Sequence, residues 1–374
     1  MTVHSKRSLK VEKLARIYDD EIAPVWGTRF GKMLLRNLAV PDRCQVLDIS
    51  CGTGYPTIEI LRRMSDGSRL IAIDASSAML DVARRKVADL GPLGKKGVFF
   101  RTEAAVPKLS FADDVYDLVV CNLGLDEVPS LEVAMRDFAR VAKKGGEVRC
   151  TLPLAGTFQE FHDLYREVLV KHDKHEALER LEKHIAHYPS IDHLERCMKS
   201  ANLDGGVEIE EFTLLFKSSR EFFFAPVIEY GPLADWKEIA GGGQEMQDVF
   251  WYIKEAIDAY YDGRPFQVTV KAGCVIGTKL EQGAAPLIHE IEDLSDLSDL
   301  AITEDPDAEN TSLPVRPPRM ASGSVRVADP DDLDVEEIAP GSPEDFPIDA
   351  DPIHEPEEIE AFIDGHDRPE HLDD

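Results

Sequence analysis

One nine-residue stretch, residues 46–54 with the sequence VLDISCGTG, limits the folds open to this chain more than any other segment. An apolar run ends around Asp48, two glycines spaced two apart follow, and Pro56 stands where a helix would begin. A strand, a glycine turn and a helix in this order present backbone N–H groups and a helix N-terminus to a bound cofactor. Glycine suits the turn because a residue without Cβ lets the backbone approach a ligand closely. The stretch therefore predicts a cofactor-binding unit.

The turn does not favour a dinucleotide as the cofactor. The dinucleotide pattern G-x-G-x-x-G has a third glycine, and this chain has Thr57 at that position. Asp48 would repel a pyrophosphate and would attract a positively charged ligand. An NAD-dependent enzyme is thus disfavoured, and an ordinary strand–helix turn without a ligand is the other alternative.

A second acidic residue follows the glycine turn at a suitable distance. The apolar run Leu70–Ile73 ends at Asp74, about 20 residues after Gly54, where a carboxylate can accept hydrogen bonds from both hydroxyls of a ribose. Ser76 or Ser77 can cap the helix that follows. A helix N-terminal acid is the alternative role of Asp74.

These segments resemble the cofactor motifs of the class I S-adenosylmethionine-dependent methyltransferases. Residues 48–54 match the family pattern D-x-x-C-G-T-G, and residues 74–80 match D-x-S-x-x-M-L. In that family the turn passes under the methionine part of the cofactor, and the second acid binds the ribose. The resemblance implies that S-adenosyl-L-methionine is the cofactor and that these residues bind it: Asp48, Cys51, Gly52, Gly54, Asp74, Ala75 and Met79.

The same resemblance implies further contacts. Tyr18, in the sequence YDDEIA, matches a tyrosine of the helix that closes over the cofactor in relatives. Glu103 and Ala104 stand where relatives carry the acid and the backbone N–H that bind adenine, with Glu103 in place of the usual aspartate. Asn122 ends the fourth strand, at the edge where an open α/β sheet binds its ligand.

The sequence does not provide an evident catalytic base. Relatives often have a histidine pair after the fourth strand, but here the matching place is LDEVP, residues 125–129, with two acids instead. Asp126 is therefore the one candidate to act on the methyl acceptor. A first-turn helix acid is its alternative role.

Strands that alternate with helices predict an α/β fold with a doubly wound, seven-stranded, mostly parallel sheet. Five strands are expected by residue 152, and two more, 207–216 and 266–279, resemble the antiparallel last pair of the methyltransferase family. We expect an N-terminal helical lid (1–40), a Rossmann-like core (41–155), helical cap insertions with the last strands (156–280) and an acidic tail (281–374). Aromatic residues in the cap suit an apolar or flat acceptor, although core packing also explains them.

The net charge of −29 is concentrated in the tail. From residue 281 onward the chain has 29 acidic side chains and four arginines, a net charge of −25, and proline is frequent. Such a composition predicts disorder. The tail is either a solubilising segment or a binding site for a protein partner.

Several classes of protein are disfavoured. The chain lacks the basic stripe of a nucleic-acid binder, and no apolar run predicts a signal peptide or a membrane span. Six cysteines without a C-x-x-C pair favour a reduced, cytoplasmic setting. Six of the 11 histidines fall within residues 162–193, where a solvated polar helix face is favoured over a metal site, so no metal is predicted.

The predicted function is S-adenosylmethionine-dependent methyl transfer to a small-molecule acceptor by in-line displacement. The alternative is a methyltransferase-like scaffold whose acidic tail binds a protein partner.

Overall fold

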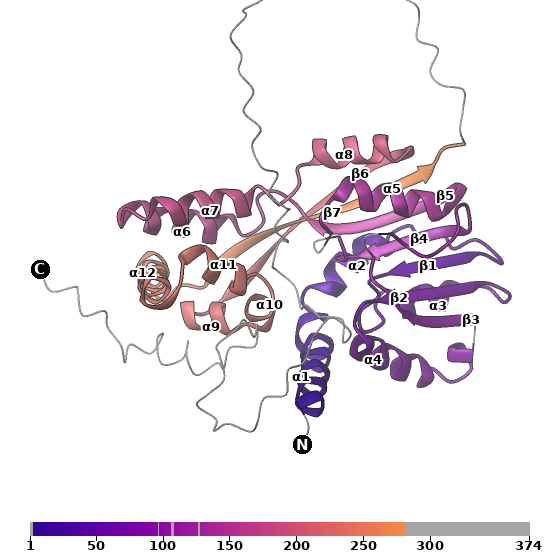
Figure 1. Cartoon of the computed structure of the whole chain (residues 1–374), viewed down its shortest axis with the longest axis horizontal. Coiled ribbons are helices and arrows are strands. Elements are labelled where there is room, and N and C mark those ends of the chain that lie inside the picture. The colour runs from indigo at the N-terminus through magenta and orange to yellow at the C-terminus, as the bar shows by residue number, and fades with distance from the viewer. Residues whose placement is uncertain (1–2, 96, 106–107, 126–127, 282–374) are drawn as a thin grey trace, which may run out of the picture.

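Seven strands form one sheet at the centre of the molecule (Figure 1). The computed structural model describes residues 3–95, 97–105, 108–125 and 128–281. The strands are β1 (Gln45–Ile49), β2 (Arg69–Asp74), β3 (Gly97–Thr102), β4 (Tyr116–Asn122), β5 (Ala142–Pro153), β6 (Leu203–Phe216) and β7 (Phe266–Lys279). Their order across the sheet is β3-β2-β1-β4-β5-β7-β6, and β7 alone runs antiparallel to both of its neighbours. The predicted doubly wound, mostly parallel sheet is confirmed.

Helices cover both faces of the sheet, as a doubly wound fold requires. One face packs against α2 (Gly27–Leu35), α3 (Thr57–Arg63) and α4 (Ser77–Ala88), and the other against α5 (Leu131–Val141) and α8 (Ile191–Ser200). Successive side chains of a strand point to opposite faces, so Val46 joins the first layer and Leu47 the second. The single-turn η2 (Leu93–Lys95) leads into β3.

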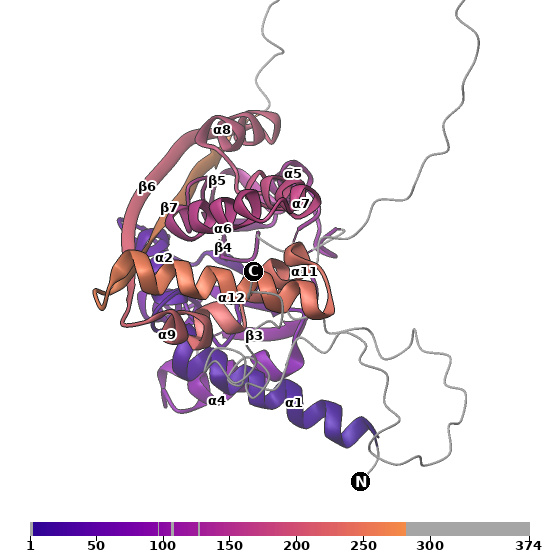
Figure 2. The same cartoon turned by 90° about the vertical axis from the view of Figure 1, so that its left-hand side faces the viewer.

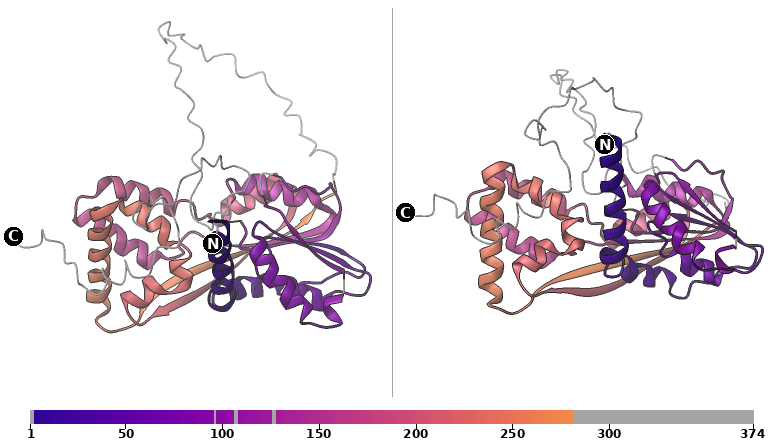
Figure 3. Two further views of the ribbon diagram at one scale, coloured as in Figure 1. Left: turned by 60° about the horizontal axis from the view of Figure 1, so that its bottom comes forward. Right: turned by 90° about the horizontal axis from the view of Figure 1, so that it is seen from below.

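The N-terminal segment lies between the sheet with its covering helices and the group of helices formed by residues 159–171, 175–185 and 219–261 (Figure 3). It consists of α1 (Val3–Ile17) and the π-helix η1 (Tyr18–Ile22), and it precedes α2. Ala15 of α1 packs against Ala78 and Val82 of α4 in a small cluster of their own. The described part of the N-terminal segment is helical, as expected.

A helical cap stands beyond the carboxyl ends of the parallel strands (Figure 2). Its helices are α6 (Gln159–Lys171), α7 (His175–Ile185), α9 (Ser219–Phe224), α10 (Pro226–Glu229), α11 (Leu233–Ala240) and α12 (Gly243–Tyr261). The cap is built on a long extension of the sheet, because β7 pairs with β6 from Phe266 onward but with β5 only from Ala272 onward. Beyond the end of β5, β6 and β7 therefore pair only with each other, and this two-stranded extension connects the sheet to the cap.

Some boundaries differ from those expected. β6 begins at Leu203, although the strand was expected only from residue 207. Helix α8 lies within the segment expected to form the cap, but it packs against α5 and β6 rather than with the cap helices. All six cysteines are buried and free. In the described part of the chain, no helix is both long enough and apolar enough to span a membrane.

Candidate active site

The glycine turn after β1 has the geometry expected of a cofactor site. Gly52 and Gly54 have φ angles of 53° and 97°, which favour glycine. A Cβ on Gly54 would lie 3.2 Å from the Cβ of Ala83, so the first turns of α4 pack directly on the backbone there. A Cβ on Gly52 would lie 3.5 Å from the ring of Tyr18. The turn is thus held between α4 and the N-terminal segment.

Tyr18 lies where the sequence predicted it, over the glycine turn. It begins the π-helix η1, a rare element that often occurs at functional sites. Its ring is close to both Gly52 and Gly27. The next residue, Asp19, pairs with Lys86 of α4 at 2.7 Å and fixes η1 to the core. The N-terminal segment and the glycine turn therefore meet at Tyr18.

Asp48 carries a buried oxygen without a hydrogen-bond partner. The side chain is fully buried, and its Oδ2 accepts a 2.5 Å hydrogen bond from the hydroxyl of Thr57. Its Oδ1 has no partner. Burial raises the pKa of Asp48 to about 7, while the hydrogen bond from Thr57 opposes the shift. An unpaired carboxylate oxygen under the turn fits a ligand that brings a positively charged N–H group.

Asp74 connects the ends of β1 and β2. Its two oxygens accept hydrogen bonds from the backbone N–H of Gly52 and of Ser76, both at 2.8 Å. Each carboxylate oxygen has a further lone pair, so the group can still accept from hydroxyls. Burial raises the pKa of Asp74, although these backbone hydrogen bonds oppose the shift. Ser76 also caps α4 by accepting from the N–H of Met79.

The remaining predicted residues after β2 and β3 surround this carboxylate. Ala75 is exposed and Met79 is half-buried beside the α1–α4 cluster. Glu103 donates its backbone N–H to the carbonyl of Asp74, whereas its side chain accepts from Ser110 and pairs with Arg101 at 2.8 Å. Ala104 is exposed. An adenine amino group would have to share the carboxylate of Glu103 with partners that the sequence did not reveal.

Asn122 and Cys51 are more deeply placed. The amide of Asn122 accepts from the hydroxyl of Thr151 at 2.7 Å and donates to the carbonyl of Gly27 at 3.1 Å. Asn122 thereby fixes the start of α2 to the carboxyl end of β4. Cys51 is fully buried, and burial holds the pKa of its thiol well above the ordinary value. Cys51 is therefore a packed neutral group beneath the turn.

Three non-glycine residues with left-handed backbone lie at the carboxyl edge of the sheet. Ser50 follows β1, Leu123 follows β4 and Phe158 lies after β5, with φ angles of 54°, 66° and 58°. Such conformations cost free energy and often mark functional sites.

Asp126, the candidate catalytic residue, lies outside the described residues.

Aromatic side chains join the core to the cap next to this edge. Trp26 stacks on Phe158 with ring centroids 5.9 Å apart and an interplanar angle of 3°. Phe30 and Phe212 pack against Trp26 from α2 and β6. Gly27, next to Trp26, is the residue held by Asn122. The aromatic junction thus adjoins the cofactor turn.

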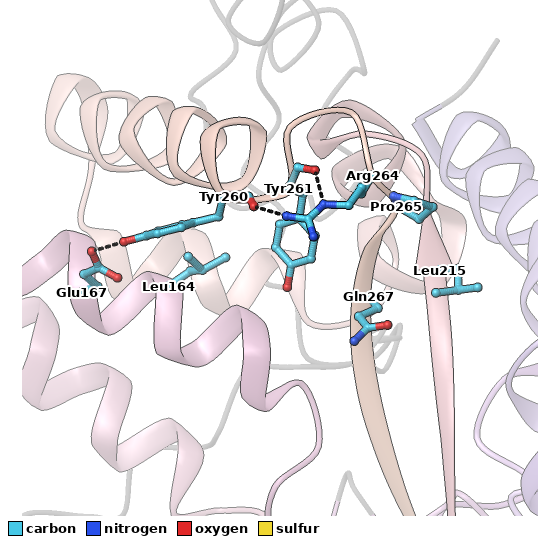
Figure 4. Close-up of a pocket in the computed structure, with 8 residues that line it drawn as sticks. All are labelled: Leu164, Glu167, Leu215, Tyr260, Tyr261, Arg264, Pro265 and Gln267. Atoms are coloured by element: carbon cyan, nitrogen blue, oxygen red, sulfur yellow. Dashed lines mark hydrogen bonds between the residues drawn. The ribbon is translucent and has the colours of Figure 1, made fainter.

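A separate hollow of about 720 Å³ lies at the far end of the β6–β7 extension (Figure 4). In this hollow Tyr260 points toward Glu167, and Arg264 is bonded to the backbone of Tyr260 and Tyr261. None of the predicted site residues lines it. We therefore place the candidate active site at the glycine turn and not in this hollow.

Comparison with known proteins agrees with the geometry of the turn. Residues 46–146, which run from β1 into β5, match a family model described as a methyltransferase domain. The chain therefore contains a methyltransferase domain within residues 46–146. It is a methyltransferase whose cofactor is S-adenosyl-L-methionine. The orphaned oxygen of Asp48, beneath a turn whose glycines admit a ligand, fits the ammonium group of that cofactor.

Individual relatives of the methyltransferase are distant in sequence. Demethylmenaquinone methyltransferase of Staphylococcus aureus is 26% identical over 215 residues, which cover 55% of this chain and 85% of that relative. The solved YcgJ protein of Bacillus subtilis is 17% identical, with a TM-score of 0.44 over 68% of this chain and 99% of that one. Geranyl diphosphate C-methyltransferase of Streptomyces coelicolor is 15% identical, with a TM-score of 0.40 over 68% of this chain and 79% of that one.

Proposed function

We propose that this methyltransferase transfers a methyl group by in-line displacement to a small apolar or aromatic acceptor. The acceptor would bind between the carboxyl edge of the sheet and the cap. The observation that carries the proposal is the grouping of Tyr18, Asp48 and Asp74 around the glycine turn. S-adenosylmethionine supplies an electrophilic methyl group, so the protein has to orient the reactants and exclude water.

Each cofactor residue has a proposed task. Asp48 takes the ammonium group of the methionine part through its unpaired oxygen, and Asp74 takes the ribose hydroxyls. Glu103 and Ala104 adjoin the adenine, with Ala75 and Met79 beside it. Gly52 and Gly54 give the backbone its close approach, while Cys51 and Asn122 position the turn and the start of α2. Tyr18 covers the turn.

The acceptor class follows from the aromatic junction. Trp26 and Phe212 are half-buried, and Arg29 lies over the ring of Phe212 at 4.7 Å. Flat rings favour flat partners, because stacked aromatic pairs are stabilised by about 0.5–1.5 kcal/mol beyond burial alone. The relative from Staphylococcus aureus, named for demethylmenaquinone, supports an acceptor with a fused ring. Asp126 stays a candidate to act on the acceptor.

Replacing Asp74 tests the cofactor site. We expect Asp74→Asn to raise the Kd for S-adenosylmethionine by about tenfold to a hundredfold, because hydrogen bonds to a charged group contribute about 1.5–3 kcal/mol. Isothermal titration calorimetry on the full chain measures this change. Asparagine is isosteric, so it can keep one of the backbone hydrogen bonds at the turn.

The matched control is Asp81→Asn. Asp81 lies on the same helix as Ser77, and its carboxylate is 58% exposed and pairs with Arg84. Such surface pairs contribute about 0–1 kcal/mol, so the Kd should stay within about threefold of wild type. Equal binding by the Asp74 variant and wild type would exclude the ribose role, and no binding by the folded wild-type chain would exclude the proposed function.

A further inference from the structure

A cluster in the cap has the same unusual property as Asp48, namely buried polar atoms without partners. In the described residues five buried side-chain atoms lack a hydrogen bond, and four of them belong to His162, His184 and Trp236. His162 and Trp236 are 1% and 0% exposed. Leaving a buried polar group unpaired costs about 1–3 kcal/mol, so native proteins contain few of them. Several such unpaired atoms close together therefore require a physical explanation.

These three side chains, hereafter the His162 cluster, come from three helices that pack together in the cap (Figure 2). His162 of α6 lies with its ring centroid 6.1 Å from that of His184 of α7 and 6.0 Å from that of Trp236 of α11. Both of its atoms Nδ1 and Nε2 are unpaired, as are Nε2 of His184 and Nε1 of Trp236. The unpaired atoms therefore belong to three rings whose centroids lie within 6.1 Å of that of His162.

The His162 cluster is continuous with the aromatic junction. The Phe158 ring lies 6.5 Å from His162 and 5.5 Å from Trp236, and its other neighbour is Trp26 at 5.9 Å. Trp26 precedes Gly27, which Asn122 holds at the carboxyl edge of the sheet. A continuous series of packed rings thus connects the segment beside the cofactor turn with the unpaired imidazoles.

The chemistry of the cluster selects a neutral polar group. Burial lowers the pKa of His162 to about 3 and that of His184 to about 4, so both are neutral near pH 7. A neutral imidazole has one donor and one acceptor, and the indole has a donor only. A hydroxyl, which both donates and accepts, complements this set.

A charged ligand fits this cluster less well than a neutral one. Arg166, the cation that acts on His162, already pairs with Glu182 and Asp163. Burying an unpaired charge costs far more than burying a hydrogen-bonded hydroxyl. Among the described residues no set of three or more His, Cys, Asp or Glu side chains could hold a metal ion.

We propose that the His162 cluster binds the hydroxyl group of the methyl acceptor, an aromatic alcohol whose ring lies along the path formed by Trp26 and Phe158. This inference rests on the proposed function and names its substrate class. Because His162 is 1% exposed, binding of the acceptor requires the packed cap helices around it to separate. Binding would then satisfy atoms that are unpaired in the closed cap.

Two probes of similar size test the proposal, 2-naphthol and 2-methylnaphthalene, which differ in the hydroxyl group. Each is titrated into the full chain saturated with S-adenosylhomocysteine. Wild type should bind 2-naphthol at least about tenfold more tightly than 2-methylnaphthalene. His162→Leu and His184→Leu should each bring the ratio of the two Kd values close to one. In ¹⁵N spectra of histidine-labelled protein, 2-naphthol should shift the imidazole nitrogens of His162, which 2-methylnaphthalene should not.

Thermal unfolding separates lost binding from lost structure. Leucine removes unpaired polar atoms, so the Tm of His162→Leu should equal or exceed that of wild type. The control is His172→Phe, since His172 follows the same helix and stacks on Tyr252 at 3.6 Å, an arrangement that phenylalanine preserves. The ratio of the Kd values for the two probes in His172→Phe should match that of wild type.

The results that overturn the inference are distinct from those that overturn the proposed function. If the wild-type ratio is close to one, or if neither leucine variant changes it, the His162 cluster is packing alone and the inference is wrong. If folded wild type fails to bind S-adenosylhomocysteine, the proposed function itself fails. If S-adenosylhomocysteine binds while the leucine variants leave the ratio of the two probe Kd values unchanged, only the inference fails.

Discussion

Asp48 couples proton binding to cofactor binding. Its carboxyl group has a pKa of about 7 in the cofactor-free protein, whereas the ordinary value is 3.8. The folded protein thus holds a proton that the unfolded chain releases, and Asp48 makes the cofactor-free protein less stable as pH rises from about 4 to 7. The ammonium group of S-adenosylmethionine prefers the ionised carboxylate. Its affinity should therefore increase with pH over the same range.

We expect the Kd for S-adenosylmethionine to fall by up to about tenfold per pH unit between roughly pH 5 and 7, and to level off above pH 7. Calorimetry at a series of pH values measures this profile. Asp48→Asn should remove the dependence, because asparagine keeps the contact with Thr57 but does not titrate in this range.

A second ligand provides the control for this profile. Methylthioadenosine has the adenine and ribose but no ammonium group, so its affinity for wild type should be nearly independent of pH. A profile shared by both ligands, or retained in Asp48→Asn, would assign the titration to another group and contradict the role of Asp48.

Local sequence patterns identified the acids of the site but not all of their partners. Asp48 and Asp74 were predictable, because each ends a strand at a fixed distance from the glycine turn. The bonds of Glu103 to Ser110 and Arg101 depend on a loop that no local pattern specifies. The expected solvated helix face is wrong for His162, which is buried.

The burial of His162 did have a signal in the sequence. It lies four residues after Phe158 and three before Tyr165, the spacing of one helical face, and both of these rings are buried. A histidine on such an apolar stripe is more often buried than solvated. The unpaired state of its nitrogens was not predictable, because that depends on side chains from α7 and α11.

Helix α1 contacts the core through α4. Ala15, 1% exposed, packs against Ala78 and Val82 of α4, next to the residues around Asp74. Tyr18 follows within one turn, so a displacement of α1 also displaces the ring that covers Gly52. A helical N-terminal segment was expected from the sequence, but its contact with α4 is known only from the structure.

We expect Ala15→Leu to raise the Kd for S-adenosylmethionine by roughly tenfold. The larger side chain overpacks the α1–α4 contact, which costs about 1–3 kcal/mol and displaces α1 from α4. The Tm should change little, because α1 lies outside the two main cores. Arg16→Ala is the control, since Arg16 is 68% exposed and its pair with Glu12 is a surface pair. Wild-type affinity in the Ala15 variant would show that α1 takes no part in the cofactor site.

The whole chain divides into a nearly neutral body and an acidic tail. The first 280 residues carry 38 basic and 42 acidic side chains, whereas the rest carries almost all of the net charge of −29. The predicted tail lies outside the described residues, which end with β7 and the two residues after it. All described elements of the sheet, the cap and the candidate site therefore precede residue 282.

Deleting residues 282–374 should leave the Tm and the Kd for S-adenosylmethionine within error of the full chain, because the described cores and the proposed cofactor residues remain complete. The solubility of the body should fall as its net charge approaches zero. Calorimetry, thermal unfolding and static light scattering on both forms measure these quantities. A pull-down that loses a protein partner, while methyl transfer to an identified acceptor is unchanged, would make the tail a separate binding module. Reduced transfer with unchanged cofactor binding would instead show that the tail acts on the acceptor, and a lower Tm would show that it stabilises the fold.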